Sequence, residues 1–122
     1  MSFRLRKGLH YEASAKEYLE KQGLKSITTN FRCRLGEIDL IMLDGDCVCF
    51  VEVRYRQRGD YGGAGASITP AKQRKIVRTA QFYLAGQQRL ANHAVRFDAL
   101  LIEPDADGRP DCNWIQNAFY AE

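Results

Sequence analysis

The sequence has few cysteines, and their spacing excludes the usual disulfide and zinc frameworks. The 122 residues include four of them: Cys33, Cys47, Cys49 and Cys112. No two are separated as in a CxxC motif, so we interpret them as reduced thiols, which are typical of cytosolic proteins. The chain also lacks an apolar run that could cross a membrane, and no apolar segment follows its basic N-terminus. These absences predict a cytoplasmic protein with no membrane partner.

Familiar nucleotide-binding loops are absent as well. The segment 57–67, QRGDYGGAGAS, is rich in glycine but matches neither a phosphate-binding loop nor a dinucleotide fingerprint. We predict that this segment is a mobile loop. The composition, 45% hydrophobic and 27% charged with a net charge of +3, is ordinary for one soluble domain spanning residues 1–122. The mild positive charge permits a polyanionic partner without requiring one.

The most informative stretch is Gly36–Arg56, GEIDLIMLDGDCVCFVEVRYR, which predicts a β-hairpin. Asp-Gly at its centre favours the positive φ angles of a tight two-residue turn. If Asp44-Gly45 forms the loop, Asp39 lies diagonal to Glu52 across the two strands. If Gly45-Asp46 forms the loop, the two acids face each other directly. Either loop places both carboxylates on one face of the hairpin, because side chains alternate along a strand.

Two neighbouring carboxylates on apolar strands repel each other and raise each other's pKa unless a cation lies between them. A hard divalent cation suits such a pair, since carboxylate oxygens are its preferred ligands. Arg54 lies two residues after Glu52 and therefore projects beside the same position. The alternative is a solvated strand face, on which Asp, Glu and Arg pair across strands and have no further role. The spacing by itself favours this second interpretation.

Hydrophobic periodicity predicts two helices. The first spans about Leu9–Gln22 and is ended by Gly23. Glu12 lies at the edge of its apolar stripe, where it either reaches a polar site on the sheet or favours the positive end of the helix dipole. The second helix begins with Thr69-Pro70, which serve as N-cap and first helical residue, and it ends at Gly86.

Gln73 occupies the middle of the apolar side of the second helix. It either hydrogen-bonds with a group at the end of the sheet nearest the loop, or it is exposed on a protruding first turn, and the sequence favours neither. Strands are predicted at Leu24–Arg34 and Val95–Glu103, and Asn113–Tyr120 either adds an edge strand or docks on the core. The order helix, three strands, helix, strand predicts an α/β sandwich, with a mixed central sheet of four or five strands flanked by helices.

The chain resembles a known family at these motifs. The segments KGLHYEASAKEYLEKQG, NFRCRLGEIDLI, FVEVRYR, TPAKQRKI and VRFDALLI follow one another as in the YraN-like family of small bacterial proteins. That family is similar to the archaeal Holliday junction resolvases of the PD-(D/E)xK nuclease superfamily. The resemblance runs from about Gly8 to Ile102 and includes Asn117–Phe119. It implies a restriction-endonuclease-like sandwich and a metal-dependent endonuclease that hydrolyses DNA phosphodiester bonds, including those of branched DNA.

The resemblance also implies roles for individual residues. Asp39 and Glu52 match the metal-binding acids of the superfamily and Glu12 matches an acid of the first helix, so these three would hold Mg²⁺ or Mn²⁺. Gln73 matches a glutamine of the second helix that faces the site. Basic side chains would neutralise the phosphates that flank the cleaved bond. They are Arg56, Lys72, Arg74, Lys75 and Arg78. Resolvases of this kind act as two-fold dimers, so a homodimer is expected.

Arg54 departs from the superfamily pattern, because it occupies the position of the lysine that orients or activates the attacking water. A guanidinium binds a phosphate or pairs with Glu52, but it does not readily give up a proton. Lys72, at the start of the second helix, is an alternative source of the ammonium group. The sequence therefore leaves three hypotheses: a nuclease, a nucleic-acid-binding module with a degenerate site, and an assembly factor that retains only the fold.

Overall fold

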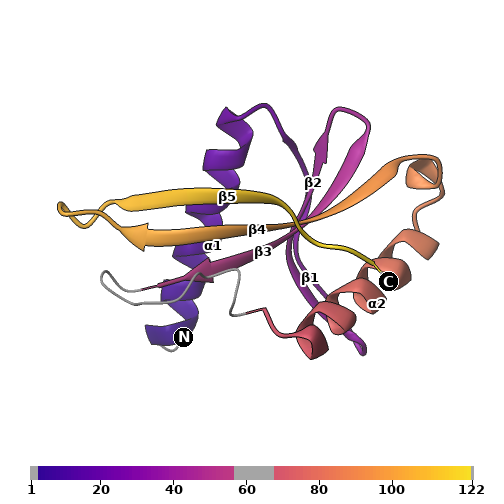
Figure 1. The fold of residues 1–122 in the computed structure, drawn as a ribbon, viewed down its shortest axis with the longest axis horizontal. Coiled ribbons are helices and arrows are strands. Elements are labelled where there is room, and N and C mark those ends of the chain that lie inside the picture. The colour runs from indigo at the N-terminus through magenta and orange to yellow at the C-terminus, as the bar shows by residue number, and fades with distance from the viewer. Residues whose placement is uncertain (1–2, 57–67, 122) are drawn as a thin grey trace.

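The computed structural model describes the backbone of residues 3–56 and 68–121, and the side chains within these ranges from residue 11 onward. The elements follow the predicted order and add a final strand (Figure 1). They are α1 (Phe3–Lys21), β1 (Lys25–Cys33), β2 (Gly36–Asp44), β3 (Cys47–Tyr55), α2 (Pro70–Ala85), the short 3₁₀ helix η2 (Gln88–Leu90), β4 (Ala94–Pro104) and β5 (Pro110–Phe119). The predicted loop at 57–67 lies outside the described residues. Among the described residues, no helix has the length and apolar character needed to cross a membrane.

The strands form a mixed sheet, as predicted. In the described part of the chain the sheet has five strands in the order β1-β2-β3-β4-β5. The pair β3 and β4 is parallel, and the other neighbouring pairs are antiparallel. The parallel pair requires a crossover connection, which contains α2, because parallel neighbours cannot be joined by a tight turn.

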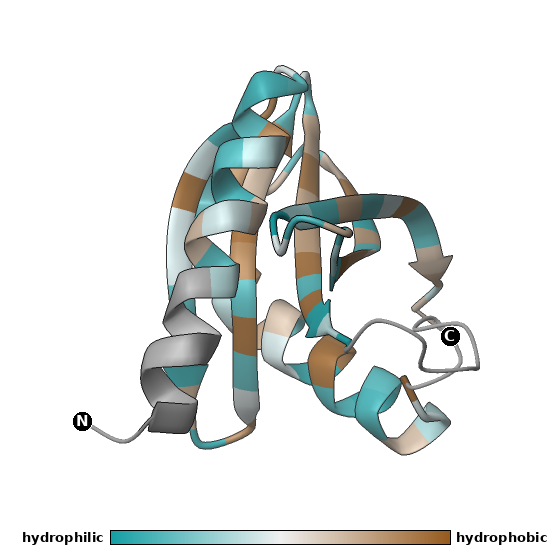
Figure 2. Ribbon diagram, turned by 90° about the vertical axis from the view of Figure 1, so that its left-hand side faces the viewer, coloured by the Kyte–Doolittle hydropathy of each residue, from teal (hydrophilic) through white to brown (hydrophobic). Residues whose placement is uncertain are grey.

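Two helices cover opposite faces of this sheet (Figure 2). Ala15 and Leu19 of α1 pack against one face, together with Leu40 and Val51 of the central strands. The other face carries a second apolar cluster, to which α2 contributes the following side chains: Ile76, Ala80 and Tyr83. The α/β sandwich expected from the sequence is confirmed, and its two cores lie on either side of β2 and β3.

Several predicted boundaries need correction. The first helix begins at Phe3 rather than Leu9. The prediction followed the apolar stripe, but the basic residues before it are good helix formers that need no buried partner. Of the two predicted hairpin loops, the structure has Gly45-Asp46, because Asp44 pairs with Cys47. The last segment is a full edge strand that begins at Pro110 rather than Asn113.

The start and end of α2 agree with the prediction. The Thr69 hydroxyl accepts a hydrogen bond of 3.2 Å from the backbone N–H of Lys72, and Pro70 occupies the first helical position. This N-cap fixes the first turn of α2, which carries Lys72 and Gln73. Gly36 then allows α2 to lie close to β2, since its φ is +155° and an added Cβ would come within 2.8 Å of the Thr79 hydroxyl. The sequence of both segments therefore sets the position of α2 over the sheet.

A buried charged network joins β4 to β5. The Asp98 carboxylate is fully buried and accepts hydrogen bonds of 2.9 Å from Arg96 Nε, 2.9 Å from Trp114 Nε1 and 3.0 Å from the backbone N–H of Asn117. Arg96 also pairs with Asp44 at 3.1 Å, so the network reaches the end of β2. Every lone pair that a buried carboxylate offers has a donor here, which is the condition under which such a charge is tolerated.

We expect Asp98→Ala to lower the free energy of unfolding by about 3 kcal/mol or more, because the change leaves the largely buried Arg96 without its main partner. Urea unfolding followed by circular dichroism measures the loss. Asp107→Ala is the matched control, because Asp107 is exposed in the turn before β5 and we expect a change within about 0.5 kcal/mol. Equal losses in the two variants would contradict the importance of the buried network.

Candidate active site

Three acidic side chains, one from each of α1, β2 and β3, meet where the pairing between β2 and β3 stops. Pairing between these two strands runs from Asp44 and Cys47 to Leu40 and Val51 and stops there. The next residues of the two strands are Asp39 and Glu52. Instead of pairing, the backbone N–H of Val53 donates to the Asp39 carboxylate at 2.8 Å. The side chain of Asp39 thus takes the place of a strand partner at the point where β2 and β3 part.

The local backbone explains why Asp39 lies at this point. Ile38 and Ile41 pack in the same apolar cluster, although strict alternation would place them on opposite faces of β2. The alternation is therefore interrupted between them, at Asp39 and Leu40. On the neighbouring strand Asn30 adopts a positive φ of 52°. The hairpin register is the predicted alternative with Gly45-Asp46 as its loop, in which the two acids adjoin each other.

Burial and the neighbouring acids raise the proton affinity of Asp39. The pKa of Asp39 is raised to about 8, chiefly by burial and next by the negative charge of Glu52. The hydrogen bond from Val53 opposes this shift, and the charge and hydrogen bond of Glu12 add to it. Glu52 is itself buried, with 8% of its surface exposed. This is the behaviour of carboxylates that share a site and together need a positive charge.

Glu12 completes the cluster from α1. Its Oε2 atom is buried and, among the described residues, has no hydrogen-bond partner. A buried polar oxygen without a partner costs free energy, so an atom of this kind in a folded protein requires an explanation. Here the Glu12 side chain lies near Asp39, and its negative charge contributes to the raised pKa of that residue. Of the two alternatives for Glu12, the structure therefore shows the one in which its side chain reaches a polar site on the sheet.

Two basic side chains adjoin Glu52, and the one from α2 is closer than the one from β3. The Lys72 ammonium lies 2.8 Å from Glu52 Oε1, whereas the Arg54 guanidinium lies 3.5 Å from the same oxygen. The lysine comes from the first turn of α2, and the arginine comes from the same strand as the acid. Both residues that the sequence offered as the cation beside the acids thus contact Glu52, and Lys72 is the closer of the two.

Gln73 does not contact the acids directly. Its side-chain Nε2 donates to the carbonyl oxygen of Ile68 at 2.9 Å, and the residue is half-buried. Gln73 therefore forms a hydrogen bond and is not merely exposed, but its partner precedes the N-cap of α2 and does not lie at the end of the sheet, as the first alternative predicted. By holding the residue that precedes the N-cap, Gln73 fixes the turn from which Lys72 projects.

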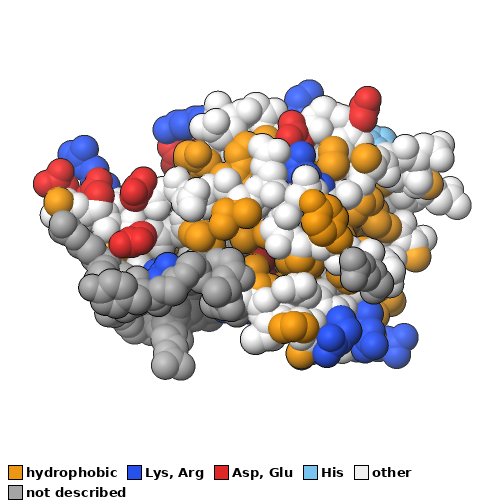
Figure 3. Space-filling model, in the orientation of Figure 1, with side chains coloured by type: hydrophobic (Ala, Val, Ile, Leu, Met, Phe, Trp, Pro, Cys, Tyr) orange, Lys and Arg blue, Asp and Glu red, His pale blue; other side chains and the backbone are white. Residues whose placement is uncertain are grey.

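The remaining predicted residues surround this cluster on the surface. Arg74, Lys75 and Arg78 are exposed along α2, and they line a shallow pocket with Ala71 and Lys72. Figure 3 shows lysine and arginine side chains gathered beside α2, at the lower right of the face in view. Arg56 follows β3, and its backbone N–H donates to the carbonyl oxygen of Ile102 at 2.9 Å. The basic residues thus form a surface that begins at Glu52 and continues along α2.

One neighbouring feature was missed from the sequence. Tyr11 and Tyr55 stack with ring centroids 4.0 Å apart. Burial, together with a hydrogen bond to Tyr55, raises the pKa of Tyr11 to about 12. The two tyrosines directly adjoin Glu12 and Arg54 in the sequence, and their stack joins α1 to β3. Each tyrosine was visible in its own segment, but only the packing of α1 against β3 brings the two together.

The donor set fits a hard divalent cation. Within the described residues, no three Asp, Glu, His or Cys side chains already stand in a metal-binding arrangement. The chemistry of the cluster is nevertheless that of oxygen ligands alone, as Mg²⁺ and Mn²⁺ prefer. Glu12 offers an oxygen without a partner, and the proton held by Asp39 is one that a cation would displace. Asp39, Glu52 and Glu12 are therefore suitable ligands.

Comparison with known proteins identifies relatives over nearly the whole chain. The model of the uncharacterised protein family UPF0102 matches residues 11–102. A UPF0102 protein of Nitrosomonas eutropha is 50% identical over 119 residues, which cover 98% of this chain and 97% of the relative. A UPF0102 protein of Pseudomonas syringae pv. syringae is 46% identical, with 97% and 96% of the two chains covered. That of Aeromonas hydrophila is 49% identical over 93% of this chain and 84% of the relative.

The pKa of Asp39 leads to an expected pH dependence of the metal-free protein. The folded state keeps this proton up to about pH 8, whereas the ordinary pKa is 3.8. The stabilising contribution of the bound proton is therefore fully present below about pH 4 and is lost as the pH rises through 8. We expect Asp39→Asn to match the wild type near the acid end of this window and to be the more stable protein at its alkaline end. Asparagine keeps an oxygen for the Val53 hydrogen bond and carries no charge.

Urea unfolding in the presence of EDTA across this pH window tests the expectation. Asp46→Asn is the matched control, because Asp46 is exposed in the hairpin loop. Its stability should follow that of the wild type at every pH. If Asp39→Asn also follows the wild type throughout, the Asp39 carboxyl does not hold a proton in the folded protein.

Proposed function

This chain belongs to the uncharacterised protein family UPF0102, and from that premise we propose that it is a metal-dependent endonuclease that hydrolyses phosphodiester bonds in DNA. The description of the family assigns no activity, so the proposal rests on the site. The observation that carries it is the convergence of Glu12, Asp39 and Glu52 beside the basic surface of α2. In that cluster the pKa of Asp39 is raised to about 8.

The acid cluster is poorly explained as a solvated strand face. On such a face the carboxylates would be exposed and paired with basic residues across the strands. Here Glu52 is 8% exposed, and Glu12 has a buried oxygen with no partner among the described residues. The acids lie between apolar residues of the two cores, since Ile38 and Leu40 flank Asp39 and Val51 precedes Glu52, so their charge is not offset by solvent. Costly features of this kind are concentrated at functional sites.

Asp39, Glu52 and Glu12 would hold Mg²⁺ or Mn²⁺. A bound ion of this type polarises a phosphoryl oxygen and lowers the pKa of a bound water, which are the two needs of phosphodiester hydrolysis. The protein itself supplies the orientation of the acids through the Val53 hydrogen bond to Asp39. It also supplies positive charge close to Glu52, where charge develops on the phosphate.

Lys72 is the residue that supports this step best. Its ammonium lies 2.8 Å from Glu52, and an ammonium can both stabilise a developing charge and exchange a proton, whereas a guanidinium does only the first. Arg54 then neutralises Glu52 from the strand and contacts phosphate. Exposed Arg74, Lys75 and Arg78 would bind the flanking phosphates, which positions DNA without reading its sequence.

Cleavage of fluorescent single-stranded, duplex and four-way-junction DNA with Mg²⁺ or Mn²⁺ tests the proposed function. We expect the wild type to cut at least one substrate and Glu52→Gln to abolish cutting, because the amide removes a charged ligand. Glu37→Gln is the matched control, since Glu37 lies on β2 with its side chain 64% exposed, and it should cut like the wild type. Mn²⁺ should also raise the melting temperature of the wild type more than that of Asp39→Asn.

Absence of both cleavage and metal-dependent stabilisation in the wild type would refute the proposed nuclease. Binding of DNA without cleavage would instead favour a nucleic-acid-binding module. Salt dependence of that binding counts the phosphates that the protein neutralises, and a salt-insensitive interaction would leave only the assembly factor among the three hypotheses.

The contribution of Lys72 is separable from that of Arg54. We expect Lys72→Met to lower the cleavage rate by about a hundredfold or more, the usual scale for loss of a residue that transfers or stabilises a proton. Lys75→Met, on the same helix, is the matched control and should reduce the rate by less than about tenfold through lost phosphate binding. Arg54→Lys should change the rate little, because an ammonium is already present. A large gain in Arg54→Lys with an active Lys72→Met would assign the role to position 54.

A further inference from the structure

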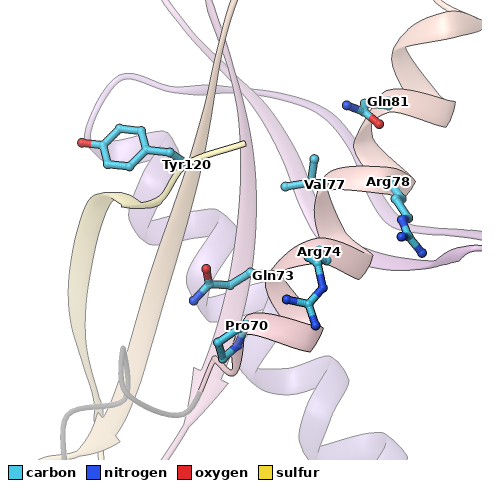
Figure 4. Close-up of a pocket in the computed structure, with 7 residues that line it drawn as sticks. All are labelled: Pro70, Gln73, Arg74, Val77, Arg78, Gln81 and Tyr120. Carbon is cyan, nitrogen blue, oxygen red and sulfur yellow. The ribbon is translucent and has the colours of Figure 1, made fainter. Parts of the chain in front are cut away.

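A second recess lies on the other side of the first turn of α2 from the acid cluster. Its volume is about 410 Å³, within the size range of pockets that hold small organic ligands. Figure 4 shows its lining: α2 forms one wall, from which Gln73 and Val77 point inward, and Tyr120, which follows β5, lies opposite with its ring extending away from the helix. The lining residues are Pro70, Gln73, Arg74, Val77, Arg78, Gln81 and Tyr120. We call this recess the α2 groove.

The charged residues that line the α2 groove are all basic. Arg74 and Arg78 line it, and none of its lining residues is acidic. Within the described part of the chain, neither guanidinium has an ion-pair partner. The two residues are four apart on one helix and therefore lie on the same face, about 6 Å apart along the axis. Two guanidinium groups on one helix, without ion-pair partners among the described residues, are suited to bind phosphates of a nucleic-acid strand.

The groove also offers surfaces for a base. Tyr120 is 69% exposed, although a large aromatic side chain is normally buried unless it has a partner. Val77 and Pro70 contribute apolar surface to the lining. Gln73 uses its side-chain nitrogen on Ile68, so its carbonyl oxygen remains to accept a hydrogen bond from a base edge. An aromatic ring beside basic residues is the usual platform for bases of single strands.

We propose that the α2 groove binds an unpaired nucleotide of the substrate, with the base stacked on Tyr120 and its phosphates held by Arg74 and Arg78. A base within a duplex is covered on both faces by its neighbours, so only an unpaired base can stack on a side chain. This inference rests on the proposed function and narrows its substrate to DNA in which a single strand meets a duplex.

The position of the groove supports this substrate class. Gln73 lines the groove, and the preceding residue Lys72 contacts Glu52 in the acid cluster. Two neighbouring residues in the first turn of α2 thus contact the two proposed sites: Lys72 the cleavage site and Gln73 the base site. A strand that leaves the groove along this turn would pass directly beside the acids. Cleavage would then occur next to the junction between paired and unpaired DNA.

Fluorescence anisotropy in EDTA tests the proposal without any cleavage. The probes are a blunt duplex, the same duplex with a 5′ or a 3′ single-stranded overhang, and overhangs that carry 2-aminopurine, whose emission falls when it stacks on an aromatic ring. We expect the wild type to prefer at least one overhang probe and to quench its 2-aminopurine. Tyr120→Ala should weaken overhang binding by about tenfold, the scale of one lost base stack, and leave duplex binding unchanged.

Matched variants separate stacking from folding and charge. Tyr120→Phe keeps the ring and should restore overhang binding and quenching. Phe82→Ala removes another exposed aromatic, 46% exposed on α2 and outside the groove lining, and should have no effect. Arg78→Gln should weaken binding of all probes and lower the salt dependence by about one released counterion. The equivalent change at exposed Arg89, Arg89→Gln, should leave both unchanged.

Three results would overturn the inference: equal affinity of the wild type for blunt and overhang probes, unquenched 2-aminopurine, or an overhang affinity that Tyr120→Ala does not change. None of these refutes the proposed nuclease, which is judged by the loss of cleavage in Glu52→Gln. If the protein cuts duplex DNA but shows no overhang preference, the proposed function stands and the proposed nucleotide site in the groove is refuted. A wild type that binds none of the probes would also refute the nucleotide site.

Discussion

The burial of neighbouring carboxylates is the constraint on which the candidate site depends. Glu12, Asp39 and Glu52 are brought together where water is partly excluded, and the pKa of Asp39 rises to about 8 in consequence. The fold tolerates the cluster because β2 and β3 part at that point, so that the Val53 N–H is available to Asp39. Lys72 then reaches Glu52 from α2. The hydrogen bond from Val53 and the ion pair with Lys72 both lower the free-energy cost of burying the three carboxylates.

The rest of the fold holds these elements at fixed distances. The apolar clusters on both faces fix α1 and α2 against the same pair of central strands. The Asp98 network attaches β5 to the end of β2 through Arg96 and Asp44. Because these contacts do not involve the acids, the charge of the cluster can change without loss of the sandwich. Such separation between the stabilising contacts and the site is what permits a costly site to persist.

Much of the fold follows from local signals in the sequence, and the remainder depends on contacts between elements. Thr69-Pro70 predicted the start of α2 because capping is a property of neighbouring residues. The hairpin register could not be chosen, since Asp44-Gly45 and Gly45-Asp46 both satisfy the turn. The stack of Tyr11 on Tyr55 and the partner of Lys72 were equally hidden, because each joins residues more than fifteen positions apart, for which spacing gives no information.

The placement of Lys72 on a helix rather than on a strand has a structural consequence. A residue on β3 has its direction fixed by the pleat, so at position 54 only a side chain of suitable length and shape can reach the acids. A lysine on α2 approaches from the opposite element, and its direction is set by the N-cap at Thr69 and the Gln73 bond to Ile68. Position 54 on β3 then need not supply the ammonium group, and Arg54 can partly neutralise the charge of Glu52 instead. The closer of the two positive charges beside Glu52 thus depends on the geometry of a helix start, which ties the site to the docking of α2.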